Sequence, residues 1–168
     1  MILSFTASSL LHGFLIAKKY KKIFGIIDHN AIYVLIAGSY TPICLLVLKN
    51  MTGALLFVII WVLAIVNISL KSIFFSRIPK WLSMISYLSM GWLVILCIVK
   101  VYEVLGLGAI VLLILAGVSF TLGSIVFYNE KPNPLPPYFG NHEIWHIAVL
   151  AGNAFIYLIM AFFVLKIT

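Results

Sequence analysis

Residues 53–70 read Gly-Ala-Leu-Leu-Phe-Val-Ile-Ile-Trp-Val-Leu-Ala-Ile-Val-Asn-Ile-Ser-Leu, an apolar run without a charged side chain. Its length is close to the roughly 20 residues that a helix needs to cross a bilayer. Apolar and polar residues do not alternate in it, as they would in a membrane β-strand. The whole chain has this character, because 64% of its 168 residues are hydrophobic and only 9% are charged. Globular domains carry about 25% charged residues. The sequence therefore predicts an all-α, polytopic membrane helix bundle.

Six apolar segments follow one another along the chain and predict six transmembrane helices in a single integral membrane domain, residues 1–168. The segments cover residues 1–17, 29–48, 53–70, 81–100, 106–128 and 142–165. Short breaks separate them, and the last break, 129–141, holds four prolines, which exclude a continuous helix there. The N-terminal run lacks a positively charged start and contains serines and His12. We therefore expect a transmembrane helix there, not a cleaved signal peptide.

The basic residues are divided unequally between the two ends of the predicted helices. The first, third and fifth breaks carry Lys18, Lys19, Lys21, Lys22, Lys71, Arg77, Lys80 and Lys131, whereas the opposite side carries Lys49, Lys100 and Lys166. Positively charged loops face the cytoplasm, so the first set predicts the cytoplasmic face. The net charge of +7 is explained in this way. Since the chain has neither a Gly-rich phosphate loop nor a basic–aromatic surface, we exclude nucleic acid as a partner.

The residues His142, Glu143 and His146 form an H-E-x-x-H motif at the start of the last apolar segment. Positions i and i+4 of a helix lie on one face, so the two imidazoles can bind one metal ion, and the motif is a known zinc pattern. His12 lies near the cytoplasmic end of the first segment, and Asp28 opens the second segment from the same face. Ionisable residues within a membrane are costly and indicate a functional site. We predict a Zn²⁺ site with His12, His142 and His146 as ligands, which leaves a fourth position for water.

Three further residues are assigned to chemistry at this site. Asp28 is suited to hold or deprotonate the water, although it could also cap the start of a helix, and the two roles can coexist. Glu143 could be a general base, a partner of a metal ligand, or a first-turn residue favoured by the helix dipole. Ser8, four residues before His12, could donate a hydrogen bond to the water or to a substrate carbonyl, or could simply be a packing residue. His29 follows Asp28 directly and should point elsewhere.

The same residues carry a family resemblance. The chain resembles the hemolysin III family, the bacterial branch of the adiponectin and progestin receptor superfamily, in three stretches: Ser8-Ser9-Leu10-Leu11-His12, residues 28–42 from Asp28 to Pro42, and Phe139-Gly140-Asn141-His142-Glu143-Ile144-Trp145-His146. The resemblance implies a seven-helix bundle with a zinc ion near the cytosolic side, three histidine ligands, a water held by the aspartate, and Ser8 nearby. Because six segments are found here, we expect that the family's first helix is absent from this chain.

Three functions remain open from the sequence. The wider superfamily is associated with hydrolysis of ceramide-type lipid amides, so the resemblance implies a zinc-dependent hydrolase of lipid amides or esters in the bacterial plasma membrane, with membrane lipid as substrate. An intramembrane metalloprotease with Glu143 as base is a second reading. The third is a non-enzymatic cytolytic pore or a receptor-like protein with structural zinc. A pore needs polar stripes along several helices, and the third, fourth and fifth apolar segments contain few polar side chains.

Overall fold

The computed structural model describes residues 18–75, 77–135 and 139–167. This part of the chain is built from helices and contains no strand, only an isolated bridge between Leu135 and Phe139. The elements are α2 (Lys18–Pro42), η1 (Ile43–Val47), α3 (Met51–Ile73), α4 (Lys80–Trp92), η2 (Leu93–Cys97), α5 (Ile98–Asn129), α6 (Asn141–Ile159) and η3 (Met160–Val164). The predicted all-α class is confirmed, and the first predicted segment, residues 1–17, lies outside the described residues.

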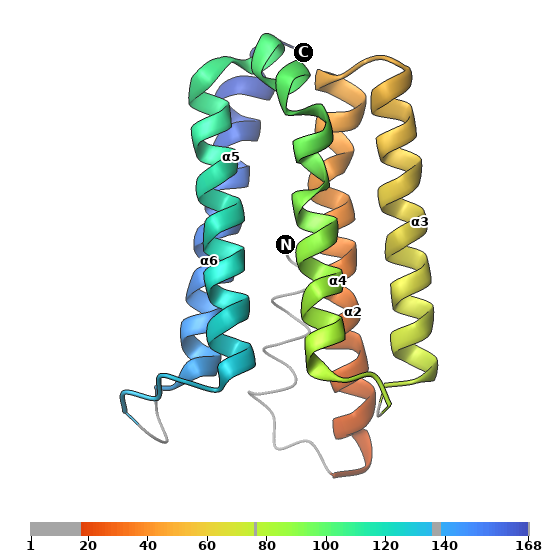
Figure 1. The fold of residues 1–168 in the computed structure, drawn as a ribbon, viewed down its shortest axis with the longest axis vertical. Coiled ribbons are helices and arrows are strands. Elements are labelled where there is room, and N and C mark those ends of the chain that lie inside the picture. Colours follow the sequence, from red (N-terminus) through yellow and green to blue (C-terminus); the bar gives the residue numbers. More distant parts are fainter. Residues whose placement is uncertain (1–17, 76, 136–138, 168) are drawn as a thin grey trace.

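Within the described ranges, four continuous helical stretches are long and apolar enough to cross a membrane: Gly25–Val47, Met51–Ile73, Lys80–Asn129 and Asn141–Val164. The third has 50 residues, which at 1.5 Å per residue is about 75 Å and far exceeds a bilayer of about 30 Å. The helix is interrupted at Gly106, whose φ of 78° lies in the left-handed region that favours glycine. Helices α4 and α5 lie as separate limbs (Figure 1). The chain is an integral membrane protein, and the predicted count of six helices is not confirmed by these four stretches.

Helix α2 begins earlier than the apolar pattern predicts. The predicted segment opens at residue 29, whereas the helix starts at Lys18. Lysine is a good helix former, so the helix continues beyond the apolar run. Asp28 therefore lies in the interior of α2, and the interpretation of Asp28 as a helix cap is wrong.

The helices form two groups, with α5 and α6 side by side in one and α2, α3 and α4 in the other (Figure 1). Two glycines allow α5 and α6 to approach closely. A Cβ atom on Gly123 would lie 2.7 Å from Ala148 Cβ, and one on Gly152 would lie 2.6 Å from the Phe120 ring. Small residues at such contacts are typical of membrane helix packing.

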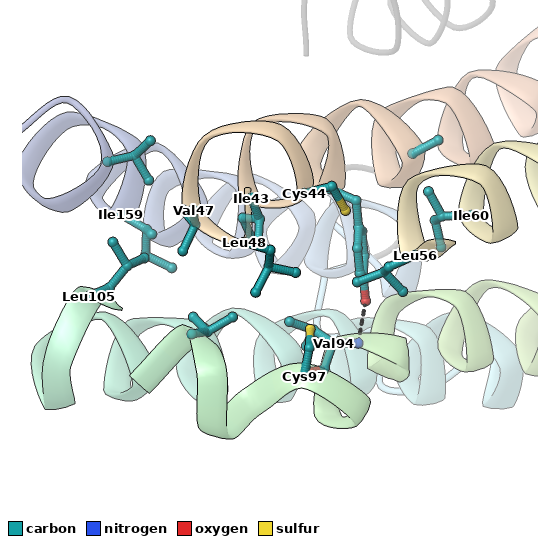
Figure 2. Close-up of a cluster of buried hydrophobic side chains, with 14 of the residues drawn as sticks. Ile43, Cys44, Val47, Leu48, Leu56, Ile60, Val94, Cys97, Leu105 and Ile159 are labelled. Carbon is teal, nitrogen blue, oxygen red and sulfur yellow. Dashed lines mark hydrogen bonds between the residues drawn. The ribbon is translucent and has the colours of Figure 1, made fainter. Parts of the chain in front are cut away.

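The apolar core gathers at the end of the bundle where α2 passes into η1 and α4 passes into η2. Figure 2 shows its central side chains, among them Ile60, Cys44 and Cys97, which are almost fully buried. Tyr40 joins α2 to α4 and η2 here, because its hydroxyl donates to Gly91 O at 2.6 Å and accepts from Val94 N at 2.8 Å. The departure of η2 from α-helical geometry is thus compensated by one side chain from α2.

Candidate functional site

The H-E-x-x-H motif occupies the first turns of α6, and the preceding loop determines where this helix begins. Glu143 Oε2 accepts a hydrogen bond from Gly140 N at 2.8 Å, and Asn133 Oδ1 accepts one from Asn141 N at 2.8 Å. These oxygens satisfy N–H groups that have no partner within a helix. Glu143 therefore has a structural task at the helix start, which agrees with the first-turn reading. Its role as a base stays a prediction.

His142 and His146 come together as their spacing predicts. Their Nε2 atoms are 3.0 Å apart, and the two rings are nearly perpendicular, at 88°. Aromatic rings surround the pair, since the Trp145 ring lies 4.9 Å from that of His146 and the Phe127 ring of α5 lies 6.0 Å from that of His142. The pair is therefore fixed by packing against α5 as well as by its own helix.

The distance between the two imidazoles fits two neighbouring positions on one zinc ion. Nitrogen ligands at about 2.0–2.1 Å in a tetrahedral arrangement are roughly 3.3 Å apart, close to the observed 3.0 Å. Within residues 18–75, 77–135 and 139–167, no group of three or more His, Cys, Asp or Glu side chains comes together as a metal site. The predicted third ligand, His12, and the nearby Ser8 lie outside the described residues, so the three-histidine site stays a prediction.

A cavity of about 150 Å³ lies between the two groups of helices. Its wall is mostly apolar and includes side chains from α2, α4, α5 and α6, such as Ile32, Leu35, Leu88, Ile95, Leu113, Ile114, Val149 and Ile156. The carboxylate of Asp28 and the imidazole of His146 lie in the same wall. Asp28 and His146, which are 118 positions apart in the sequence, are thereby brought to the wall of one cavity.

Asp28 and its neighbour His29 face different surroundings. Asp28 is buried, with 8% of its surface exposed, and lines the cavity. The His29 ring instead bonds through Nδ1 to Gly25 O at 2.8 Å and meets the Phe75 ring edge-on. The expectation that His29 points away from the site is confirmed. An ionisable side chain within a membrane-spanning helix is energetically costly and indicates a functional site. Asp28 lines the cavity, so the cavity is the candidate for that site.

Sequence reasoning missed two polar residues near this end of the bundle. Lys71, which the sequence places in a loop, lies inside α3 and is buried, with its Nζ donating to Ser83 Oγ at 2.7 Å and lying 5.4 Å from the centre of the Phe75 ring. Tyr87 of α4 lines the cavity. Neither position stands out in the sequence, because each depends on a contact between helices.

Comparison with known proteins now identifies the family. The family profile described as "Haemolysin-III related" matches residues 1–157. Hemolysin-3 of Bacillus cereus is 42% identical over 165 residues, covering 98% of this chain and 72% of the relative. The Hemolysin-3 homolog of Bacillus subtilis (strain 168) is also 42% identical, over 99% of this chain and 75% of the relative. No solved structure matches. The resemblance seen in the sequence is confirmed, and the chain belongs to the haemolysin-III-related family.

Proposed function

We propose that this chain is a membrane hydrolase of lipid amides or esters that uses Zn²⁺ held by His12, His142 and His146. The observation that supports this most directly is the cavity wall, where Asp28 and His146 share a mostly apolar surface. The 3.0 Å separation of the His142 and His146 nitrogens suits two ligands of one ion. When bound, zinc would supply Lewis-acid polarisation of the scissile carbonyl.

The protein's own groups perform the remaining tasks in this proposal. Asp28 accepts the proton of the attacking water as a general base, and Ser8 holds the water or the substrate carbonyl by a hydrogen bond. The apolar wall excludes bulk water, which strengthens each electrostatic interaction inside. A cavity of about 150 Å³ is large enough for a benzene-sized group. It therefore accommodates the part of a membrane lipid next to its amide or ester, and the rest of the acyl chain extends into the bilayer.

The proposal places the protein in the bacterial plasma membrane with six crossings and the site toward the cytoplasm. The loops at residues 74–79 and 130–140, which carry Arg77 and Lys131, are then cytoplasmic. A cysteine at Arg77 should be shielded from an impermeant thiol reagent in intact cells, whereas one at Asn50 should react. The native Cys44 and Cys97 are buried, so their background labelling is low. Labelling in the reverse order would overturn this orientation.

Two other functions compete with the hydrolase. The name of the relatives denotes haemolysis, which favours a cytolytic activity for this chain as well. The mostly apolar wall of the cavity does not suit a water-filled pathway through one chain. A metalloprotease would use Glu143 as base, but the Glu143 carboxylate is engaged at the start of α6. These observations support the lipid hydrolase with Asp28 as base.

The variants Asp28→Asn and Glu143→Gln distinguish Asp28 from Glu143 as the general base. Asp28→Asn keeps the size of the side chain but cannot accept a proton, so turnover of a ceramide-like substrate should fall by about 10²–10⁴-fold while zinc content is retained. Glu143→Gln keeps an oxygen for the Gly140 N–H and should have a much smaller effect. Fatty acid release and cleavage of a transmembrane peptide would be measured side by side. An inactive Glu143→Gln beside a nearly normal Asp28→Asn would support the protease, and a zinc-loaded wild type inactive on both substrates would support the non-enzymatic reading.

A further inference from the structure

Gly91 of α4 lines the cavity, although nothing in the described part of the chain requires a glycine there. Among the described glycines only Gly106 has a positive φ, so the backbone at Gly91 would accept a side chain. A Cβ atom added at Gly91 would meet no atom of the described residues within 4 Å. Since a glycine inside a helix is less stable than an alanine, the missing side chain leaves open space at a cost in stability. That space calls for an explanation.

The open space in front of Gly91 belongs to the cavity. Tyr87 and Ile95, which lie four residues before and after Gly91, both line the cavity, as do Leu88 and Trp92. Residues three or four apart lie on the same face of a helix. Gly91 is therefore at the centre of the face that α4 and η2 turn toward the cavity, and a side chain there would project into it.

Two other glycines show how Gly91 differs from its counterparts. Gly117 of α5 also lines the cavity, but a Cβ atom on it would lie 3.1 Å from the Trp92 ring, so close packing accounts for it. Gly38 of α2 also has no described atom within 4 Å of its Cβ position, but it is not among the described residues that line the cavity. Gly91 thus combines a place in the cavity wall with space that no described side chain fills.

The level of Gly91 along the bundle indicates what could occupy this space. Gly91 O accepts a hydrogen bond from Tyr40 Oη at 2.6 Å, and Tyr40 follows Asp28 by 12 residues along α2, which is about 18 Å. Asp28 and Tyr40 both line the cavity, and Leu35 and Ile36 between them give it an apolar wall. The acyl chains of one leaflet span about 15 Å, half of the hydrocarbon core. A lipid chain that starts beside Asp28 is therefore long enough to reach Gly91.

We infer that Gly91 leaves room for the acyl chain of the lipid substrate and thereby determines the length of chain that the cavity accepts. This inference rests on the proposed function and adds a residue that selects the substrate by its chain. A larger side chain at this position would occupy the space that the acyl chain needs. Lipids with chains too short to reach Gly91 would bind equally well with or without that side chain.

Competition for binding tests the inference in the full chain, purified in detergent and treated with a chelator so that no zinc-dependent hydrolysis occurs. A palmitoyl amide and a butyryl amide of the same amine would each compete with a photoreactive palmitoyl amide for labelling of the protein. Gly91→Leu should weaken binding of the palmitoyl amide about tenfold, the effect of displacing about two methylene groups, and leave binding of the butyryl amide unchanged. Gly38→Leu, the matched control, should leave both unchanged. Palmitoyl binding by Gly91→Leu equal to that of the wild type, or an equal loss for both amides, would overturn the inference.

Stability and turnover provide further readouts. Because Gly91→Leu fills open space and removes a glycine from a helix, its melting temperature should equal or exceed that of the wild type. A lower melting temperature would show that the protein itself fills this space and would overturn the inference. If the zinc-loaded wild type releases no fatty acid from either amide while Gly91→Leu still discriminates against the palmitoyl chain, the proposed function alone fails. If the wild type hydrolyses the palmitoyl amide and Gly91→Leu does so with equal kcat/KM, the Gly91 inference alone fails.

Discussion

The two ends of the bundle differ in the kind of side chain that they bury. At the end shown in Figure 2, apolar side chains such as Ile60 are fully buried, and the Tyr40 hydroxyl satisfies two backbone groups. At the other end, Asp28 is buried in the wall of a cavity that Tyr87 and His146 also line. Tyr40 and Val94 of the core end line the same cavity, so the two ends differ in the polar side chains that they place there and not in completeness of packing. The comparison predicts that substitutions at the first end change stability, whereas those at the second end change binding.

The largest expected effect is on metal content at the site end. His146→Ala should reduce bound zinc from about one ion per chain to less than a tenth of that, because an incomplete ligand set binds weakly. The matched control is His29→Ala, since His29 faces Gly25 and Phe75 and should leave zinc unchanged. Metal analysis of the detergent-purified protein provides the measurement. Full zinc occupancy in a His142→Ala, His146→Ala double variant would contradict the site and with it the comparison.

The next effect belongs to the core end. Ile60→Ala should lower the free energy of unfolding by about 2–5 kcal/mol through the cavity that it creates, while zinc binding is retained. Val62→Ala, on the same helix but with 52% of Val62 exposed, should cost less than about 0.5 kcal/mol. Unfolding in detergent would be followed by circular dichroism. Equal losses for the two variants would show that burial in this bundle does not determine stability.

Substitutions of Lys71 and Ser83 test how a buried polar contact near the site affects stability. Ser83→Ala removes the acceptor of a buried ammonium group and should cost about 1–3 kcal/mol. Lys71→Met removes the charge itself, keeps a long apolar side chain, and should be neutral or stabilising. Thermal unfolding of both variants tests this asymmetry. If Lys71→Met were the more destabilising of the two, the ammonium group would have a favourable role that its contact with Ser83 does not explain.

The smallest effect concerns the exposed ion pair of Lys80 and Glu130, which joins the start of α4 to the end of α5. The hydrogen bond and the charge of Lys80 lower the pKa of Glu130 from its usual value. A group whose pKa is lower in the folded state stabilises the protein above its unfolded pKa, about 4.3 for glutamate, and loses this contribution as the pH falls through the folded pKa. The small difference in melting temperature between wild type and Lys80→Gln should therefore be present at pH 6 and vanish on acidification. A difference that persisted below the pKa of Glu130 would indicate packing by the Lys80 stem.

The sequence predicted those features that depend on local pattern. Apolar run lengths predicted the helices, Asn50 and the proline-rich stretch marked breaks, and the i, i+4 spacing predicted the meeting of His142 and His146. The predicted start of α2 at residue 29 was wrong, because the residues before the apolar run also form helix. The Lys71–Ser83 bond and the packing of the Tyr33 and Tyr87 rings could not be predicted, since each depends on how side chains from different helices face one another.

Gly106 also determines where the chain reverses direction between α4 and α5. Within α5, Gly106 alone departs from helical dihedrals, and a Cβ added there would meet no atom within 4 Å. A side chain would therefore be resisted by backbone conformation alone, not by crowding. The two limbs on either side of Gly106 belong to one stretch of 50 residues, too long to span a bilayer unbent, and Lys100 and Glu103 near the bend are exposed. We expect the limbs to enter the membrane as a hairpin, with a single achiral residue deciding where the chain reverses.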